Sequence, residues 1–316
     1  MSEARRNGRS MRPEAGGPRV LVVYKKSAYQ TNVRERKNPR FLELLARKDP
    51  SVARLIEAHD DHQATLEEAH EAVERLGVRA TFRFRGDEGL VEDFDLLVTV
   101  GGDGTLLWAA RWVGPGMPVV AINSAPMDSV GHFCAGKKGH VRTILARALA
   151  GELHRTELTR MQVRLDGEII TRRVLNDVLF AHPSPAATTR YLLSHETKGG
   201  RGGARTEEQK SSGLWIGPAA GSTAAQRSAG GKVLPIASRK LQYVVREPYH
   251  PGGRRIAMVR GLVGEREQLR IVSKIREGRL FIDGPHRLCD VRMGSEIVLS
   301  RSSEPLTLLG LRRARR

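Results

Sequence analysis

The chain has 316 residues, which is enough for two domains of ordinary size, and 40% of them are hydrophobic, so a buried core is expected. Its 53 Lys and Arg residues outnumber its 35 Asp and Glu residues, and the formal net charge of +18 favours anionic partners: nucleotides, nucleic acids or acidic surfaces. The 2 cysteines lie far apart, no run of about 18 apolar residues occurs, and 5% of the residues are aromatic. The sequence therefore argues against a disulfide framework, a structural zinc site, a transmembrane helix and a base-stacking platform for nucleic acid.

Residues 1–18 are polar and rich in arginine, and they lack the apolar segment of a secretory signal. We expect them to form a disordered tail. The sparse cysteines favour a reducing compartment, and we expect the protein in the cytoplasm. Because the basic residues are spread along the chain, an Arg-rich solvated surface is a better interpretation of the charge than a groove for nucleic acid.

Strands and helices alternate over residues 19–151, which predicts a Rossmann-like α/β domain with a parallel sheet and helices on both faces. Apolar runs indicate the strands, and apolar residues at helical spacing indicate the helices. In such sheets ligands collect at the carboxyl ends of the strands, where Gly101–Thr105 and Asn123 lie. The expected strands are residues 19–24, 78–84, 94–100 and 117–122, and the expected helices are residues 41–47, 66–76, 106–113 and 141–149.

Residues 152–316 show a different pattern, of short apolar runs separated by turns, which predicts a β-rich domain with antiparallel strands. Asp166-Gly167 lies between two such runs and is typical of a hairpin turn. The expected strands are residues 158–165, 168–180, 190–195, 213–217, 241–246, 268–275 and 279–282. Residues 199–210, rich in Gly, Arg and Glu, are expected to form a loop.

The sequence Gly101-Gly102-Asp103-Gly104-Thr105 connects an apolar strand to a helix. Such a turn presents backbone N–H groups at a helix N-terminus, and its glycines allow a phosphate chain to approach the backbone. Asp103 adds a carboxylate, which beside a phosphate can bind a hydroxyl, accept its proton or help to hold Mg²⁺. The combination indicates phosphoryl transfer to an alcohol. The alternative is an ordinary turn with an Asp at the start of a helix.

Two further segments contain candidate binding residues. Asn176-Asp177 interrupts an apolar run, where unpaired polar residues are costly, so it indicates either recognition of a hydroxyl or base, or a strand end or bulge with local hydrogen bonds. Residues 217–231, rich in Gly, Ser and Ala, either allow a ligand to approach the backbone or form an ordinary loop. Residues 131–138 resemble a P-loop, but Lys138 stands where the Mg²⁺-binding Ser or Thr belongs.

Together these motifs resemble those of the NAD kinase family. Gly101–Thr105 is similar to its GGDGT turn, Asn176-Asp177 to its Asn-Glu motif, and Asp283-Gly284 to a late Asp-Gly pair. Residues 221–231, which contain GSTA and SAGG, are similar to the family's glycine-rich segment. This segment is the more specific match, because diacylglycerol, sphingosine and 6-phosphofructo-kinases share the GGDGT turn. The stretches 123–132, 210–214 and 246–248 resemble the mitochondrial-type branch of the family.

The resemblance implies an NAD-kinase-like fold, with an α/β domain at 19–151 and a β-rich, NAD-binding domain at 152–316, and it allows the last residues to return to the first domain. It implies ATP-dependent phosphorylation of the adenosine-ribose 2′-hydroxyl of NAD(H) to give NADP(H), with Asp103 orienting and deprotonating that hydroxyl. The ATP phosphates would be held by Gly101, Gly102, Gly104 and Thr105. NAD would be bound by Asn123, His132, Asn176, Asp177, Ser222, Thr223 and Ala224.

The resemblance also implies Mg²⁺ that enters with ATP rather than in a protein metal site, no tightly bound cofactor, and a homo-oligomer, with a dimer favoured. The expected partners are NAD(H) and ATP, with neither a membrane nor a nucleic acid. Four residues depart from the family pattern: Asp177 replaces Glu, Ser212 stands where many members have Asp, Ala225 stands where many have a Tyr that can stack on adenine, and His132 replaces the usual Phe.

Two other functions remain open from the residues. A GGDGT-type lipid kinase, acting on a diacylglycerol-like alcohol, shares the phosphate-binding turn, although the match at residues 221–231 argues against it. A non-catalytic nucleotide- or nucleic-acid-binding protein would explain the net charge of +18.

Overall fold

The structure, a computed structural model, describes residues 17–311 apart from residues 88, 90–92, 128, 198, 200–202, 251 and 253–255. The chain divides into two compact units. Unit 1 comprises the chain up to Val113, residues 117–155 and the chain from Leu308 onward, and unit 2 comprises residues 114–116 and 156–307. The tail expected at residues 1–18 lies almost wholly outside the described residues.

A sheet of seven strands forms the centre of unit 1, with the main order β2-β1-β3-β4-β19-β6 and with β5 paired to β4. The pairs β1–β2, β1–β3, β3–β4 and β4–β5 are parallel, which confirms the predicted α/β class. The strands are β1 (Arg19–Tyr24), β2 (Arg79–Phe84), β3 (Leu96–Gly101), β4 (Pro118–Asn123), β5 (Gly136–Lys137), β6 (Arg155–Leu158) and β19 (Leu306–Leu309).

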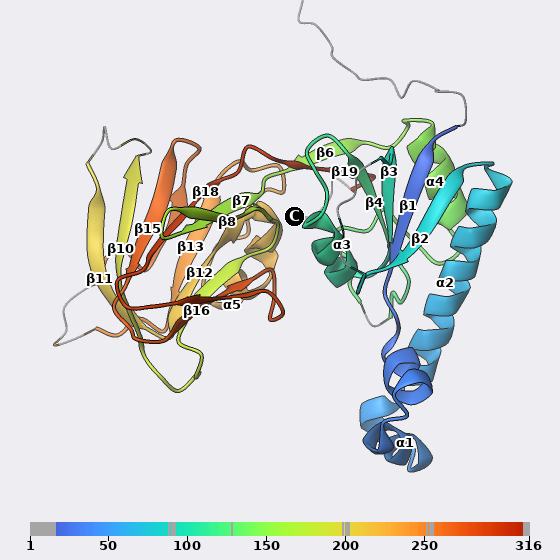
Figure 1. Cartoon of the computed structure of the whole chain (residues 1–316), viewed down its shortest axis with the longest axis horizontal. Helices are drawn as coiled ribbons and strands as arrows, with labels where there is room; N and C mark the ends of the chain where they lie inside the picture. The colour runs from blue at the N-terminus through green and yellow to red at the C-terminus, as the bar shows by residue number, and fades with distance from the viewer. Residues whose placement is uncertain are drawn as a thin grey trace, which may run out of the picture. The chain divides into compact units, whose positions relative to one another are not determined.

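Helices lie on both faces of this sheet (Figure 1). The apolar sides of α2 (Leu55–Arg75) and α4 (Val141–Leu149) share a buried cluster with alternate residues of β1, β3 and β4. On the other side, α3 (Asp103–Ala110) contacts the same three strands. Three short helices precede α2: η1 (Gln30–Glu35), α1 (Pro39–Ala46) and η2 (Pro50–Val52).

The packing of α2 against α4 also involves a polar contact. The Glu68 carboxylate of α2 accepts hydrogen bonds from the backbone N–H groups of Gly139, at 2.7 Å, and Val141, at 2.8 Å. These donors lie at the start of α4, where helix N–H groups lack partners within the helix and where a negative charge is favourable. Glu68 therefore fixes the start of α4 against α2.

Unit 2 contains two six-stranded sheets, in the orders β11-β10-β15-β18-β7-β8 and β14-β13-β12-β9-β16-β17. One buried apolar cluster combines residues from both sheets, so the sheets pack face to face as a β-sandwich. The first sheet contains β7 (Met161–Leu165), β8 (Glu168–Val174), β10 (Thr189–Thr197), β11 (Arg205–Ser211), β15 (Glu267–Ser273) and β18 (Glu296–Arg301). The second contains β9 (Val178–Ala181), β12 (Gly213–Pro218), β13 (Leu241–Arg246), β14 (Arg260–Val263), β16 (Gly278–Ile282) and β17 (Leu288–Val291).

Several predicted boundaries were wrong. The single strand expected at residues 168–180 is two strands, β8 and β9, which belong to different sheets. The loop expected at residues 199–210 contains most of β11, a charged strand at the edge of its sheet, where polar side chains face water and deter pairing with other chains. The helix expected from residue 106 begins at Asp103, so its first turn includes part of the glycine motif.

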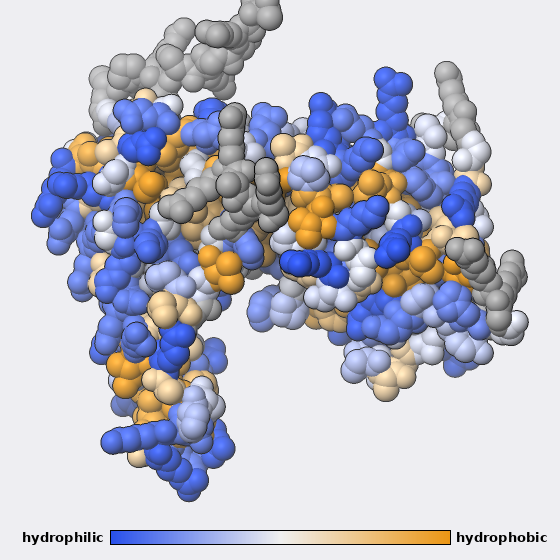
Figure 2. Space-filling model, turned by 180° about the vertical axis from the view of Figure 1, so that it is seen from behind, coloured by the Kyte–Doolittle hydropathy of each residue, from blue (hydrophilic) through white to orange (hydrophobic). Residues whose placement is uncertain are grey.

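The Asp166-Gly167 turn was predicted correctly. It connects β7 and β8 as a hairpin, and both residues have positive φ, at 50° and 89°. Among the described residues, no helix is both long and apolar enough to span a membrane. On the face drawn in Figure 2, hydrophilic residues surround small scattered groups of hydrophobic ones, the usual pattern where a core takes up most of the large apolar side chains.

Candidate functional site

The glycine turn lies at the carboxyl end of β3. Gly101 is the last residue of the strand, Gly102 is the N-cap of α3, and Asp103 is the first helical residue. A Cβ atom at Gly101 would collide with the Thr105 side chain, and one at Gly102 would collide with the Ser129 hydroxyl. A side chain at either position would therefore force Thr105 or Ser129 to shift.

Gly104 and Thr105 differ in their surroundings. Gly104 is exposed, and a Cβ atom there would meet no atom within 4 Å, so its backbone is open to an approaching ligand. Thr105 is buried, and its hydroxyl has no hydrogen-bond partner among the described residues. The Thr105 N–H bonds back to the Gly102 carbonyl at 2.9 Å. The N–H groups of the helical residues before it, which have no acceptor earlier in the helix, lie beside this open backbone and suit an anion.

The Asp103 carboxylate is held by the loop that follows β4. Its Oδ2 atom accepts a hydrogen bond from the backbone N–H of His132 at 2.7 Å, and its Oδ1 atom accepts one from Phe133 at 3.0 Å. Two backbone donors fix the orientation of the carboxylate, and each oxygen keeps a second lone pair for another donor. The side chain of His132 is exposed, so this residue contributes to Asp103 through its main chain.

Asn123 supports the same loop. It ends β4 directly beside Gly101, and its Nδ2 atom donates to the carbonyl of Ser129 at 2.7 Å, while its Oδ1 atom accepts from the N–H of Ala125 at 3.3 Å. Asn123 is buried. Both ends of its amide therefore hold the loop that reaches Asp103, so unit 1 brings together Gly101–Thr105, Asn123 and His132.

The second group of predicted residues lies in unit 2, where the chain leaves β8 for β9. The Asp283 carboxylate accepts hydrogen bonds from the backbone N–H groups of Leu175 (3.1 Å), Asn176 (2.7 Å) and Asp177 (3.2 Å). These bonds satisfy the main chain where it passes from one sheet to the other. Asp283 and Gly284 have positive φ, as the predicted turn requires. The role of the Asp283 carboxylate was not predicted, because its partners lie more than a hundred residues away.

Asp177 is a buried carboxyl group with few donors. Its Oδ2 atom accepts from the Asn176 side chain at 2.9 Å. Burial, and to a lesser extent the negative charge of Asp283, raise the pKa of Asp177 to about 7. A carboxyl group that changes charge near neutral pH can accept hydrogen bonds from hydroxyl groups once it is ionised, and a perturbed pKa is itself a common feature of functional sites.

The glycine-rich segment packs directly against this connection. Cβ atoms at Gly217 or Gly221 would collide with the carbonyl oxygen of Asn176. Gly221 and Ser222 belong to η3 (Ala219–Thr223), and α5 (Ala225–Ser228) follows. Glycine at these positions therefore lets the predicted segment 221–224 lie against Asn176 and Asp177.

Ser222 is buried, whereas the next two residues, Thr223 and Ala224, are exposed. The Ser222 hydroxyl is fully buried, donates to the carbonyl of Ala219 at 2.7 Å and accepts from the N–H of Leu234 at 2.9 Å, so it holds the segment in place. Unit 2 thus brings together Asn176, Asp177, Ser222, Thr223 and Ala224, and the predicted residues form two groups, one in each unit.

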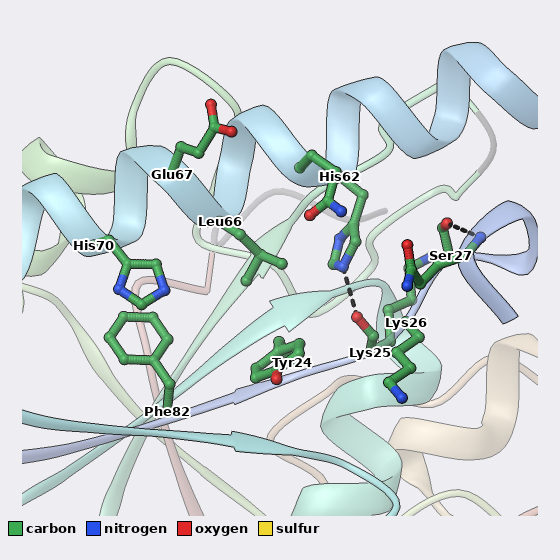
Figure 3. Close-up of a pocket in the computed structure, with 11 residues that line it drawn as sticks. Tyr24, Lys25, Lys26, Ser27, His62, Leu66, Glu67, His70 and Phe82 are labelled. Carbon is green, nitrogen blue, oxygen red and sulfur yellow. Dashed lines mark hydrogen bonds between the residues drawn. The ribbon is translucent and has the colours of Figure 1, made fainter. Parts of the chain in front are cut away.

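A cavity of about 500 Å³ lies in unit 1 between α2 and the carboxyl ends of β1 and β2 (Figure 3). Its walls include the stacked rings of His70 and Phe82, with centroids 3.7 Å apart, together with Tyr24 and Lys25. His62 of α2 also lines it. None of the predicted site residues does. The sequence offered no motif for this cavity, because its lining comes from two strands, the segment after β1, η1 and α2, without a shared spacing.

Comparisons of the sequence with known proteins all point to NAD and NADH kinases. A family model described as the ATP-NAD kinase N-terminal domain matches residues 32–153. A probable NADH kinase of Oryza sativa subsp. japonica is 34% identical over 234 residues, which cover 69% of this chain and 72% of that protein. An NADH kinase of Arabidopsis thaliana is 32% identical over 234 residues, covering 69% and 73%.

Solved structures extend the likeness in fold over nearly the whole chain. An NAD kinase from Archaeoglobus fulgidus, solved in complex with ATP, has a TM-score of 0.65 and 18% identity, and the match covers 93% of this chain and 94% of that one. A yeast NADH kinase, solved in complex with NADH, has a TM-score of 0.63 and 16% identity, covering 94% and 84%. At this level of identity the likeness concerns the fold.

Proposed function

The chain belongs to the NAD kinase family, and from that premise we propose that it transfers the γ-phosphoryl group of ATP to the adenosine-ribose 2′-hydroxyl of NAD(H), giving NADP(H). One observation carries the proposal. Asp103 lies at the start of a helix whose glycine turn is open to a phosphate chain, and its carboxylate is held by two backbone N–H groups of the loop that follows β4. A proton acceptor and an anion-binding backbone side by side suit phosphoryl transfer to an alcohol.

In this proposal Asp103 orients the 2′-hydroxyl and accepts its proton as the oxygen bonds to the γ-phosphorus and the bond to the β-phosphate oxygen breaks. The backbone of Gly101, Gly102, Gly104 and Thr105 holds the phosphates. Positioning and charge neutralisation supply most of the rate, and the proton transfer contributes about 10²–10⁴-fold.

The residues of unit 2 would bind NAD(H). Asn176 and Asp177 would hold the hydroxyl groups of the adenosine end, because the ionised Asp177 carboxylate accepts from hydroxyls and the Asn176 amide offers both a donor and an acceptor. Thr223 and Ala224 present exposed surface beside them, and Ser222 fixes that surface from beneath. Asn123 and His132, proposed from the sequence as NAD-binding residues, contribute through the loop that holds Asp103.

Mg²⁺ is proposed to enter with ATP. The glycine turn supplies one carboxylate, that of Asp103, and backbone N–H groups, and this donor set suits a cation that keeps most of its ligands from phosphate and water. When bound, the cation neutralises charge on the phosphates. A cytoplasmic location and a homodimer, both expected from the sequence, remain proposals.

The test is to follow the terminal phosphate of labelled ATP in the presence of Mg²⁺ and two competing acceptors, NAD and a dispersed diacylglycerol. We expect the label in NADP and none in the lipid. Label in the lipid alone would replace this function with that of a GGDGT-type lipid kinase.

A further inference from the structure

His62 is a buried residue of α2, only 2% exposed, for which the proposed reaction has no use so far. Both nitrogens of its ring make short hydrogen bonds. Nε2 bonds the carbonyl oxygen of Lys25 (Figure 3), at 2.6 Å, and Nδ1 lies 2.8 Å from the hydroxyl of Ser124. A buried imidazole with two polar partners on different segments connects those segments.

The two partners of His62 flank the strand that ends in the glycine turn. Lys25 follows β1 and Ser124 follows β4, and in the sheet these strands lie on either side of β3. Each segment also bonds the end of β3: the Lys25 N–H lies 3.4 Å from the Val100 carbonyl, and the Ser124 N–H donates to the Gly101 carbonyl at 3.0 Å. His62 thus ties together the two segments that hold the end of β3.

Ser124 is also the first residue of the loop that holds the Asp103 carboxylate. The loop runs from Ser124 to Phe133, Asn123 fixes its middle, and the N–H groups of His132 and Phe133 at its far end donate to Asp103. We propose that His62 is a positioning residue for phosphoryl transfer: by fixing Ser124 against β1, it sets the loop that orients the Asp103 carboxylate. The inference rests on the proposed function for its kinetic readout.

The protonation of His62 suits a fixed connection rather than proton transfer. A carbonyl oxygen only accepts, so Nε2 carries the hydrogen that bonds Lys25, and Nδ1 accepts from the Ser124 hydroxyl. Burial, with smaller contributions from the nearby Lys25 and His59, lowers the pKa of His62 to about 4, against the opposing effect of the Lys25 carbonyl. The ring therefore stays neutral at neutral pH, and both bonds persist.

Two substitutions separate the two bonds. In His62→Asn, the shorter side chain places an oxygen near the former Nδ1 position and can keep the bond to Ser124 while losing Lys25. In His62→Gln, an amide nitrogen near the former Nε2 position can keep the bond to Lys25 while losing Ser124. His59→Asn is the matched control, because His59 lies on the same helix, is also 2% exposed, and bonds the Ser27 hydroxyl at 2.8 Å instead.

We expect both His62 variants to lower kcat for NADP formation by about 10- to 100-fold, because a small misplacement of a catalytic group is costly, with little change in KM for NAD or ATP. His59→Asn should leave kcat close to that of the wild type. As a single change, Ser124→Ala should lower kcat. Combining it with His62→Gln should lower kcat no further than either change does, because both remove the same bond.

A second readout does not depend on catalysis. Amide hydrogen exchange of His132 and Phe133 in the unliganded protein should be faster in both His62 variants and in Ser124→Ala, and unchanged in His59→Asn. Normal kcat and normal exchange in the His62 variants would overturn the inference, as would an equal effect of His59→Asn. If His62 variants fail to fold, Ser124→Ala decides. Faster exchange in a protein that makes no NADP would instead count against the proposed function alone.

Discussion

The Asp103 carboxylate is the single group on which the proposed chemistry depends most. Both of its oxygens accept hydrogen bonds from backbone N–H groups, so its orientation is set before any substrate binds. In Asp103→Asn the side chain loses its ability to take a proton, and its NH₂ group faces one of these donors. We expect turnover to fall by about 10²–10⁴-fold, measured as NADP formation under saturating substrates.

NAD binding by the Asp103→Asn variant, measured by calorimetry, should remain substantial, because the residues proposed to bind the adenosine end lie elsewhere in the chain. One mismatched N–H pair costs about 1–3 kcal/mol of stability, so a moderate fall in the unfolding temperature is expected as well. A variant with near-normal turnover would refute the role assigned to Asp103.

Asp177 should make NAD binding depend on pH. Its pKa is raised to about 7, first by burial and then by the charge of Asp283. The ionised carboxylate is the better acceptor for ribose hydroxyls, so KM for NAD should fall as the pH rises from 6 to 8. In Asp177→Asn the KM for NAD should be higher and should vary little over this range, as measured by initial rates at each pH.

The same shift fixes the sign of a stability effect. The folded pKa of Asp177, about 7, exceeds its ordinary value of 3.8, so the folded state holds this proton more tightly than the unfolded state. The stabilisation is fully present below about pH 3.8 and is lost as the pH rises through about 7. Denaturant unfolding at several pH values measures this effect. As the pH rises, the free energy of unfolding of the wild type should fall relative to that of Asp177→Asn.

Among the secondary-structure elements, the turns at the start of α3 and in η3 use glycine for different reasons. At Gly221 a Cβ atom would collide with the Asn176 carbonyl, whereas at Gly104 it would meet nothing within 4 Å. We expect Gly221→Ala to destabilise the protein and to weaken NAD binding, because the connection between β8 and β9 must shift. Gly104→Ala should leave the fold as stable or slightly more stable, since Ala favours a helix by about 1 kcal/mol over Gly.

Gly104→Ala is therefore a clean test of phosphate binding at the turn. A methyl group on the open backbone would hinder the approach of a phosphate, so KM for ATP should rise while the unfolding temperature holds. The measurement is the initial rate against ATP concentration at fixed NAD, with thermal unfolding of the same sample. An unchanged KM for ATP would place the phosphates away from this residue.

The elements also show what the sequence could not reveal. Apolar runs located most strands, but the division of residues 168–180 into β8 and β9 depends on the Asp283 carboxylate, which binds three N–H groups at the break. A contact across about a hundred residues leaves no local pattern. The apolar spacing predicted a helix only over residues 66–76, whereas α2 begins at Leu55. The bond between His62, in the missed part of α2, and Ser124 depends on where β1 and β4 end.

The predicted residues form two groups, one in each unit, for which we propose separate tasks. The sequence placed them in two domains because their motifs follow different kinds of strands, and it named most of the residues in each group. What it could not supply is orientation: Ser222 faces inward while Thr223 is exposed, and His132 acts through its main chain.

Because the two groups lie in different units, we expect the stabilisation by NAD and the stabilisation by Mg-ATP to be lost in different variants. A ligand that binds the folded state stabilises it, by about 2.7 kcal/mol at a hundred times its dissociation constant. Asp177→Asn should reduce the rise in unfolding temperature caused by NAD and spare that caused by Mg-ATP, and Gly104→Ala should do the reverse. Equal losses for both ligands in either variant would contradict the assignment of the two groups.

The most direct test of the proposed function is the product itself. The purified protein is incubated with Mg-ATP and either NAD or NADH, and NADP(H) is then detected with an NADP-specific dehydrogenase, with Asp103→Asn run alongside. We expect the wild type to form NADP(H) from at least one of the two acceptors, at a rate far above that of the variant. Absence of NADP(H) with both acceptors, from a folded wild-type protein, would contradict the account.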